Sequence, residues 1–326
     1  MLPDRTRGFR TPAVLLGALA VVAALVTGCA PVTAHDASGP AVVAAAATGA
    51  AVTNTLTVGG LERSYLLRTP VRASDDPMPL LIVIHGAGGN ADRAELATGI
   101  TQLSDADGFI VAYPNGTQAA DIPGELSWNA GVCCGRPVVD QIDDVAFIAA
   151  TIADISEKEP VDASRIYVAG FSNGGMLAHR LACELPGRIA GIAVVAGALN
   201  VSDCAAEGVT SVLMMHGTGD LTVPYQGGAT NERTAKRFGT WTNAPLSRAV
   251  SFWTGQDACG SSPKTSEKNG VTRTTYEACA DGAKVDVITI RDGGHIWPVE
   301  AKSGIDASTF ITEYFGLGKP VATLAQ

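Results

Sequence analysis

Arg165-Ile-Tyr-Val-Ala-Gly-Phe-Ser-Asn-Gly-Gly175 is an apolar run that ends in a glycine-rich turn. The apolar half favours a buried strand, and leucines at every fourth position from 177 to 185 favour a helix after the turn. A strand that turns sharply into a helix is the setting of the Gly-x-Ser-x-Gly motif, which exposes the serine Oγ. The motif predicts Ser172 as a nucleophile, and a glycine-rich turn with an idle serine is the simpler alternative.

Apolar runs elsewhere in the chain alternate with amphipathic segments. Strands are predicted at 80–84, 109–113, 165–169, 192–195, 212–215 and 285–290, helices at 93–103, 143–157 and 174–185, and an N-terminal β-hairpin at 56–58 and 64–67. Continuous apolar strands between helices predict an α/β fold, with a mostly parallel central sheet and helices on both faces.

Composition excludes several classes of protein. With 326 residues, 46% hydrophobic and 17% charged, the chain has ample material for a large core, which excludes a disordered or coiled-coil protein. The net charge of −9 argues against a nucleic-acid partner, because phosphate neutralisation needs a basic surface.

The N-terminus has the pattern of an export signal. Three arginines within the first ten residues precede the apolar run 13–26, which is too short for a comfortable membrane span. Val26-Thr-Gly-Cys29 follows and resembles a bacterial lipobox. We expect a signal peptide at 1–28 and a lipid anchor on Cys29. The alternative is an ordinary signal peptide followed by a chance cysteine.

The remaining chain divides into three parts. An Ala-rich tether is predicted at 29–53, one folded domain at 54–317 and a tail at 318–326. Export predicts oxidised cysteines. Cys259 and Cys279 flank a polar loop and are expected to pair, whereas Cys133, Cys134, Cys183 and Cys204 allow three pairings. The sequence holds no Cys-x-x-Cys, which argues against zinc, so no metal site is expected.

A serine nucleophile needs a base and an acid. Of the five histidines, His35 lies in the tether, His179 lies two turns along the helix after Ser172, and His85 and His216 each end a strand. His295 remains, in a glycine-flanked loop after the strand 285–290. It is the predicted base, and a buried structural histidine is the alternative.

Asp220 is the predicted acid. It follows the strand 212–215, at the carboxyl end where a loop can aim a carboxylate at His295. Among its competitors, Asp257 and Asp281 neighbour cysteines, and Asp286 lies within a strand. The role of Asp220 is to hold the imidazole tautomer and stabilise the imidazolium.

Backbone N–H groups are the expected partners of a reaction oxyanion. One is that of Asn173, directly after the nucleophile, and another comes from the loop His85-Gly-Ala-Gly-Gly89. The loop lacks the spacing of a phosphate-binding glycine loop. The pair Asp143-Asp144 invites a metal interpretation, but adjacent helical side chains diverge, so helix capping is expected instead.

Several motifs together carry a family resemblance. They are Val83-Ile-His-Gly-Ala-Gly-Gly89, Ser127-Trp-Asn-Ala-Gly-Val-Cys-Cys-Gly135, Asp143-Asp-Val-Ala-Phe147, Gly170-Phe-Ser-Asn-Gly-Gly-Met176, His216-Gly-Thr-Gly-Asp220 and Gly293-Gly-His-Ile-Trp-Pro298. In this order they resemble the polyhydroxybutyrate depolymerase and feruloyl esterase group of α/β-hydrolases, over about 54–317. The resemblance implies Ser172, Asp220 and His295 as catalytic residues, an oxyanion hole near Ala87 and Asn173, and no cofactor.

Aromatic residues near these motifs are candidates for substrate binding. We expect Trp128, Phe171 and Trp297 to line the cleft, with ordinary packing as the alternative for each. Nothing in the sequence decides between a feruloyl group and a short hydroxyacyl chain.

The expected protein is a monomeric serine carboxylesterase, acting on short-chain, hydroxyacyl or hydroxycinnamoyl esters. It would be exported, and either held at the outer face of a bacterial membrane by lipid or secreted. Two alternatives stay open: a cell-envelope acyltransferase on the same fold, and a non-catalytic surface lipoprotein with an adhesion or immune-facing role.

Overall fold

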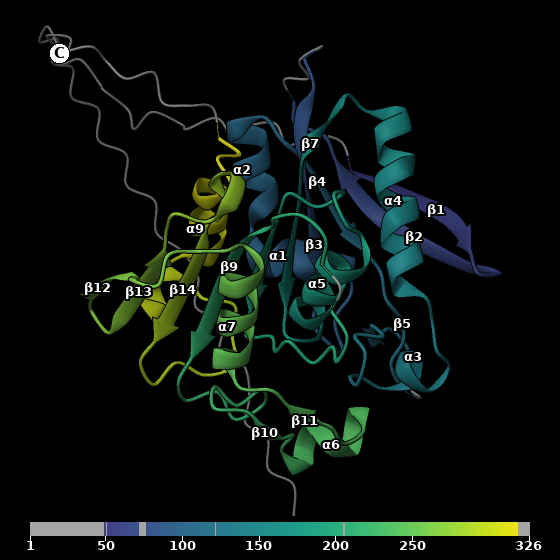
Figure 1. The fold of residues 1–326 in the computed structure, drawn as a ribbon. Coiled ribbons are helices and arrows are strands. Elements are labelled where there is room, and N and C mark those ends of the chain that lie inside the picture. The colour runs from purple at the N-terminus through teal and green to yellow at the C-terminus, as the bar shows by residue number, and fades with distance from the viewer. Residues whose placement is uncertain (1–48, 50, 72–75, 121, 205, 319–326) are drawn as a thin grey trace, which may run out of the picture. The chain divides into compact units, whose positions relative to one another are not determined.

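Ten strands form one sheet in the computed structural model, which describes residues 49, 51–71, 76–120, 122–204 and 206–318 (Figure 1). They lie in the order β1-β2-β4-β3-β7-β8-β9-β14-β13-β12. Their bounds are β1 (Ala51–Val58), β2 (Leu61–Arg68), β3 (Met78–Ile84), β4 (Ile110–Pro114), β7 (Val161–Phe171), β8 (Gly191–Val195), β9 (Ser211–Gly217), β12 (Lys264–Lys268), β13 (Val271–Tyr276) and β14 (Val285–Ile290). Two small ribbons pair β5 (Thr117–Gln118) with β6 (Leu126–Ser127) and β10 (Gly228–Ala229) with β11 (Thr242–Asn243).

The centre of the sheet is parallel, as the sequence predicts. Strands β4, β3, β7, β8, β9 and β14 pair in parallel, and antiparallel strands extend both edges. The predicted N-terminal hairpin is β1 paired with β2. It begins at Ala51, three residues inside the predicted tether.

Helices cover both faces of the sheet (Figure 1). They are α1 (Ala91–Thr98), α2 (Ile100–Asp107), α3 (Arg136–Val139), α4 (Asp144–Lys158), α5 (Asn173–Glu184), α6 (Glu232–Phe238), α7 (Leu246–Gln256), α8 (Glu300–Ser303) and α9 (Ala307–Tyr314), with a 3-10 turn at Ala280–Gly282. Strand β3 shows the two cores: Leu80, Ile82 and Ile84 pack with α4, α5 and α7, whereas Leu81 and Val83 pack with α1, α2 and α9. Alternation along the strand sends successive side chains to opposite faces.

Two predicted segments differ in the structure. The single helix expected at 93–103 is broken at Gly99, whose φ of 63° caps α1 and starts α2 in a new direction. The polar segment between Cys259 and Cys279, expected to be a loop, is the hairpin β12–β13, which turns at Asn269-Gly270 and extends the sheet.

The six cysteines of the described region form disulfides. Cys259 pairs with Cys279 at the base of the β12–β13 hairpin, Cys183 with Cys204, and Cys133 with its neighbour Cys134. The predicted signal peptide 1–28, the anchor Cys29, His35 and the tail beyond Gly318 lie outside the described residues. Among the helices that the structure does describe, none combines the length and apolarity needed to cross a bilayer.

Candidate active site

Ser172 lies at the sharp turn between β7 and α5. It has a φ of 55° and a ψ of −119°, a strained conformation for a residue with a side chain, and its N–H donates to Val195 O over 2.8 Å. Glycines make this turn possible, because a Cβ on Gly170 would lie 2.2 Å from Gly174 O, and one on Gly174 would lie 2.4 Å from Ile84 O. The strained turn therefore follows from the local sequence.

Ser172, His295 and Asp220 form one hydrogen-bonded chain. Ser172 Oγ lies 2.9 Å from His295 Nε2, and His295 Nδ1 lies 2.7 Å from Asp220 Oδ2. The three residues follow β7, β14 and β9, whose carboxyl ends meet at one edge of the sheet. The geometry suits an Nδ1–H that donates to the carboxylate and an Nε2 lone pair that accepts the serine proton.

Asp220 is held firmly in a buried position. Its Oδ1 accepts the N–H groups of Thr222 and Val223 over 2.8 and 2.9 Å. Burial alone would raise the pKa of Asp220, but hydrogen bonds with His216 and His295 hold the pKa of this carboxyl well below its ordinary value. Asp220 is therefore ionised at neutral pH and can stabilise an imidazolium at His295.

The other described histidines have structural partners. His85 Nδ1 donates to Gly86 O and its Nε2 accepts the N–H of Gly116, and burial lowers the pKa of His85 to about 4. His179 accepts a hydrogen bond from the indole N–H of Trp253, and burial lowers the pKa of His179 to about 3.

His216 Nε2 donates to the carbonyl of residue 223 over 2.8 Å and lies 3.4 Å from Asp220 Oδ2, so it helps to hold the acid.

The glycine loop after β3 passes directly beside Ser172. A Cβ on Gly86 would lie 3.2 Å from Ser172 Cβ, so only glycine allows this approach without displacing the neighbour. Ala87 follows in the same loop. On the other side, Asn173 is the first residue of α5, and its N–H has no acceptor within the helix. Both predicted oxyanion donors thus belong to segments next to the serine.

A cleft of about 500 Å³ opens beside His295. Its walls are the loop after β3, Ala94 and Ala97 of α1, and the side chains of Phe171, Ile296 and Trp297. The Phe171 ring is tilted against the His295 ring, with centroids 4.9 Å apart, and the Trp297 indole N–H donates to Ser308 Oγ.

The prediction that Trp128 lines the cleft is wrong. Its side chain is 0% exposed and stacks on Phe147, and its indole N–H donates to His85 O over 2.9 Å. An indole N–H needs a partner when it is buried, and the carbonyl at the end of β3 supplies one. Trp128 therefore packs beneath the glycine loop and cannot contact a substrate in the cleft.

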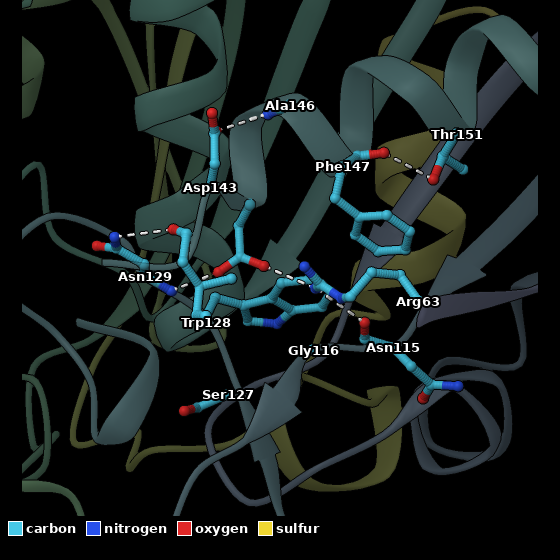
Figure 2. Close-up of polar contacts among 12 residues, drawn as sticks. Arg63, Asn115, Gly116, Ser127, Trp128, Asn129, Asp143, Ala146, Phe147 and Thr151 are labelled. Carbon is cyan, nitrogen blue, oxygen red and sulfur yellow. Dashed lines mark hydrogen bonds and ion pairs between the residues drawn. The ribbon is translucent and has the colours of Figure 1, made fainter. Parts of the chain in front are cut away.

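The acidic pair at the start of α4 divides into two roles. Asp143 caps the helix by accepting the N–H of Ala146, as predicted (Figure 2). For Asp144 the prediction of capping is wrong, because its side chain is buried and forms an ion pair with Arg63. Burial raises the pKa of Asp144, against the opposing effect of the Arg63 charge. Sequence reasoning missed Arg63, although it did single out the Asp143-Asp144 motif.

Within the described ranges, no group of three or more His, Cys, Asp and Glu side chains is arranged to hold a metal ion. The site holds a serine hydroxyl, an imidazole and a buried carboxylate in one hydrogen-bonded chain, with the backbone N–H groups of Ala87 and Asn173 in the segments beside the serine. This set of groups is suited to acyl transfer.

Comparison with known proteins identifies the family. Residues 63–234 match the family described as Esterase PHB depolymerase. The chain belongs to this esterase family. The match covers more than half of its 326 residues and confirms the resemblance seen in the sequence motifs.

Curated relatives of this PHB depolymerase-family esterase are esterases by name. NocK of Nocardia uniformis subsp. tsuyamanensis, classed as an esterase, is 33% identical over 74% of this chain and 72% of its own length. Feruloyl esterase B of Piromyces equi is 33% identical over 68% of this chain but only 40% of its own length. The family and these relatives make the protein an ester-hydrolysing enzyme of the serine hydrolase type.

Solved structures agree on the fold of the esterase. An acetyl xylan esterase from Aspergillus awamori superposes with a TM-score of 0.58 over 82% of this chain and 100% of its own, at 18% identity. At this identity the likeness shows the fold alone. It confirms the α/β-hydrolase fold that the family resemblance of the sequence motifs implies.

Proposed function

We propose that the esterase hydrolyses carboxylic esters through an acyl-enzyme on Ser172, with His295 as the base and Asp220 as the acid. The hydrogen-bonded chain from Ser172 Oγ through His295 to Asp220 supports this assignment most directly. A histidine so placed can remove the serine proton and return it to a leaving group.

The proposed reaction has two halves. Ser172 Oγ attacks the ester carbonyl carbon while its proton moves to His295 Nε2, and the alcohol leaves with that proton as the C–O bond breaks. Water then attacks the acyl-enzyme, gives a proton to Nε2, and the acid is released as Ser172 regains its proton. In both halves the oxyanion accepts the N–H groups of Ala87 and Asn173, each worth about 10² to 10³ in rate.

For the substrate, we propose short-chain, hydroxyacyl or hydroxycinnamoyl esters. The cleft has the size of a small-molecule site, and Phe171, Ile296 and Trp297 supply apolar surface for an acyl group. Comparing kcat/KM for methyl ferulate, short p-nitrophenyl esters and soluble hydroxybutyrate oligomers separates the three. A wild-type protein that cleaves no ester in the panel would favour the non-catalytic surface protein.

The assignment of Ser172 is tested with p-nitrophenyl acetate. Ser172→Ala is expected to lower kcat at least about 10³-fold, because the nucleophile is lost. The exposed Ser202 offers a matched control, and Ser202→Ala should keep the wild-type rate. Equal rates for Ser172→Ala and wild type would refute the proposal.

A product analysis with a sugar or lipid acceptor present separates hydrolysis from acyl transfer. The wild-type enzyme should yield free acid, and exclusive acyl transfer would instead identify an acyltransferase.

We also propose that the protein is exported and lipid-anchored through Cys29. The support is the sequence pattern of the first 29 residues. Intact-mass analysis of membrane-fraction protein should show an acylated Cys29, and Cys29→Ser should release the enzyme from that fraction. An unmodified N-terminus at another residue would contradict the anchor.

A further inference from the structure

Arg63 of β2 and Asp144 of α4 form an ion pair inside the protein. Arg63 Nη2 lies 2.7 Å from Asp144 Oδ1, and the two side chains are 3% and 0% exposed. Desolvation makes such buried pairs costly, and apolar side chains of similar volume are often as stabilising. The contacts of the pair, rather than its contribution to stability, indicate what it does.

Asp144 fixes the backbone of Asn129. Its second oxygen accepts a hydrogen bond from the Asn129 N–H over 2.7 Å. Asn129 is held further by its side chain, which donates to Ile142 O, and by Arg180, which donates to Asn129 O over 2.8 Å. The peptide that joins Asn129 to Trp128 is therefore fixed by a buried carboxylate.

Trp128 connects this peptide to both sides of the oxyanion hole. Its backbone N–H donates to Asn173 Oδ1 over 2.8 Å, and Asn173 Nδ2 donates back to Trp128 O over 3.1 Å. Its indole N–H donates to His85 O, two residues before Ala87. One residue thus holds the two segments that carry the proposed donors.

Arg63 reaches the glycine loop by a second route. The same Nη2 donates to Asn115 O over 3.2 Å, and the N–H of the next residue, Gly116, donates to His85 Nε2 over 3.1 Å. The Arg63 guanidinium lies 4.0 Å from the centre of the Phe147 ring, which supports it from the other side (Figure 2). Both members of the ion pair are therefore linked to His85.

We propose that Arg63 and Asp144 are positioning residues for the oxyanion hole, which set the backbone N–H groups of Ala87 and Asn173 through Trp128 and His85. This inference rests on the proposed role of Ser172. A misplacement of about 1 Å can cost about 10²-fold in rate, so donors fixed by a buried network gain accuracy that surface loops lack. Loss of the pair should weaken stabilisation of the transition state and leave substrate binding nearly unchanged.

Two double variants test the inference. Arg63→Met with Asp144→Leu replaces the pair by apolar side chains and removes the acceptor for Asn129, whereas Arg63→Met with Asp144→Asn keeps that acceptor. With p-nitrophenyl acetate, the first variant should lower kcat about 10- to 100-fold and change KM less than about threefold. Its affinity for a trifluoromethyl ketone, which adds to Ser172 as a tetrahedral adduct, should fall by the same factor as kcat. The Asn variant should recover part of both losses.

Controls separate positioning from general stability. Arg68, on the same strand, forms a partly buried ion pair with Glu95 over 2.6 Å, and Arg68→Met should lower Tm without lowering kcat. If the Met/Leu variant fails to fold, Arg63→Lys provides the test, because an ammonium lacks the planar guanidinium that lies over the Phe147 ring and brings Nη2 to both Asp144 and Asn115. It should show the same parallel loss of kcat and ketone affinity.

The inference is overturned if the folded Met/Leu variant, or the folded Arg63→Lys variant, keeps the wild-type kcat. It is also overturned if that variant loses kcat while its affinity for the ketone is unchanged. These outcomes are distinct from failure of the proposed function. A fully active Ser172→Ala enzyme would remove the proposed function itself, whereas an inactive Ser172→Ala enzyme beside fully active Arg63 variants would remove the positioning role alone.

Discussion

Trp128 and Asn173 hold each other through two hydrogen bonds of opposite direction, 2.8 and 3.1 Å long. The side chain of the residue after Ser172 is thereby bound to a segment 45 positions earlier in the chain. Because the backbone N–H of Asn173 is a proposed oxyanion donor, this contact ties the start of α5 to the interior of the protein.

Asn173→Ala keeps the backbone N–H and removes only the side chain that positions it. We expect kcat for p-nitrophenyl acetate to fall about tenfold with KM nearly unchanged, since one donor moves from its best position. Thermal unfolding should show a loss of about 1 to 3 kcal/mol, because Trp128 N–H is left without its partner. A folded variant with wild-type kcat would show that the side chain has no positioning role.

Asp220→Asn tests the acid. The amide keeps an acceptor for the turn at 222–223, but it no longer stabilises the imidazolium and disfavours the Nδ1–H tautomer of His295. We expect kcat to fall on the order of 10³- to 10⁴-fold. Asp292 lies in the same loop as His295 and is exposed, so Asp292→Asn should keep kcat within about twofold. Similar losses in both variants would argue against a special role for Asp220.

Two tryptophans should respond differently to substitution. Trp297 lines the cleft, so Trp297→Ala should raise KM for methyl ferulate more than for p-nitrophenyl acetate. Trp128 is buried and bonded to His85 O, so Trp128→Phe should lower kcat and Tm and leave KM for both esters nearly unchanged. A selective rise in KM for the ferulate ester in Trp128→Phe would restore Trp128 as a substrate contact.

Asp257 makes stability depend on pH. Burial raises its pKa to about 6, whereas the unfolded chain releases this proton near pH ~3.9. The folded state therefore binds more protons between these values, and stability falls as pH rises from about 4 to 6. Asp257→Asn keeps the acceptor for Thr210 N–H and should be more stable than wild type at pH ~7.5, by at most ~3 kcal/mol. Denaturant unfolding at pH ~4 should show no such gain.

Asp162 provides a control, because its pKa is shifted in the opposite direction from that of Asp257. Hydrogen bonds from Ser164 and Arg165 lower its pKa to about 2. Its stabilisation is present above the unfolded pKa of about 3.9 and is lost as pH falls toward 2, so Asp162→Asn should weaken the fold at neutral pH. A gain at neutral pH in both Asn variants would show that the effect at Asp257 does not arise from its titration.

Two disulfides close loops of similar length. Cys183–Cys204 spans 21 positions and Cys259–Cys279 spans 20. Loop-closure entropy predicts that replacing either pair by alanine lowers the free energy of unfolding by about 2 to 4 kcal/mol. Neither disulfide contacts Ser172, His295 or Asp220, so kcat at a temperature well below Tm should stay at the wild-type value. Reduction of all disulfides in the wild-type enzyme before denaturant unfolding should lower the free energy of unfolding by at least as much as the more destabilising of the two alanine replacements.

Much of the fold and of the candidate site is predictable because it depends on local pattern. The turn at Ser172 follows from Gly170 and Gly174, whose missing Cβ atoms allow the strand and helix to meet. Alternating apolar runs predict the parallel strands, and the carboxyl ends of those strands bring Asp220 and His295 to one edge. The break at Gly99 and the hairpin at Asn269-Gly270 also have local signals, which a search for long periodic segments passes over.

The nucleophile turn, the parallel sheet and the candidates for the acid and the base can be predicted from local sequence, because each depends on a few neighbouring residues. The burial of Trp128 and the pairing of Asp144 with Arg63, 81 positions away, depend on long-range packing and are visible only in the folded protein. A tryptophan or a carboxylate can lie in a cleft or in the protein interior, and the residues that it contacts decide between the two positions. Those partners come from distant segments that meet only when the sheet and its helices pack together.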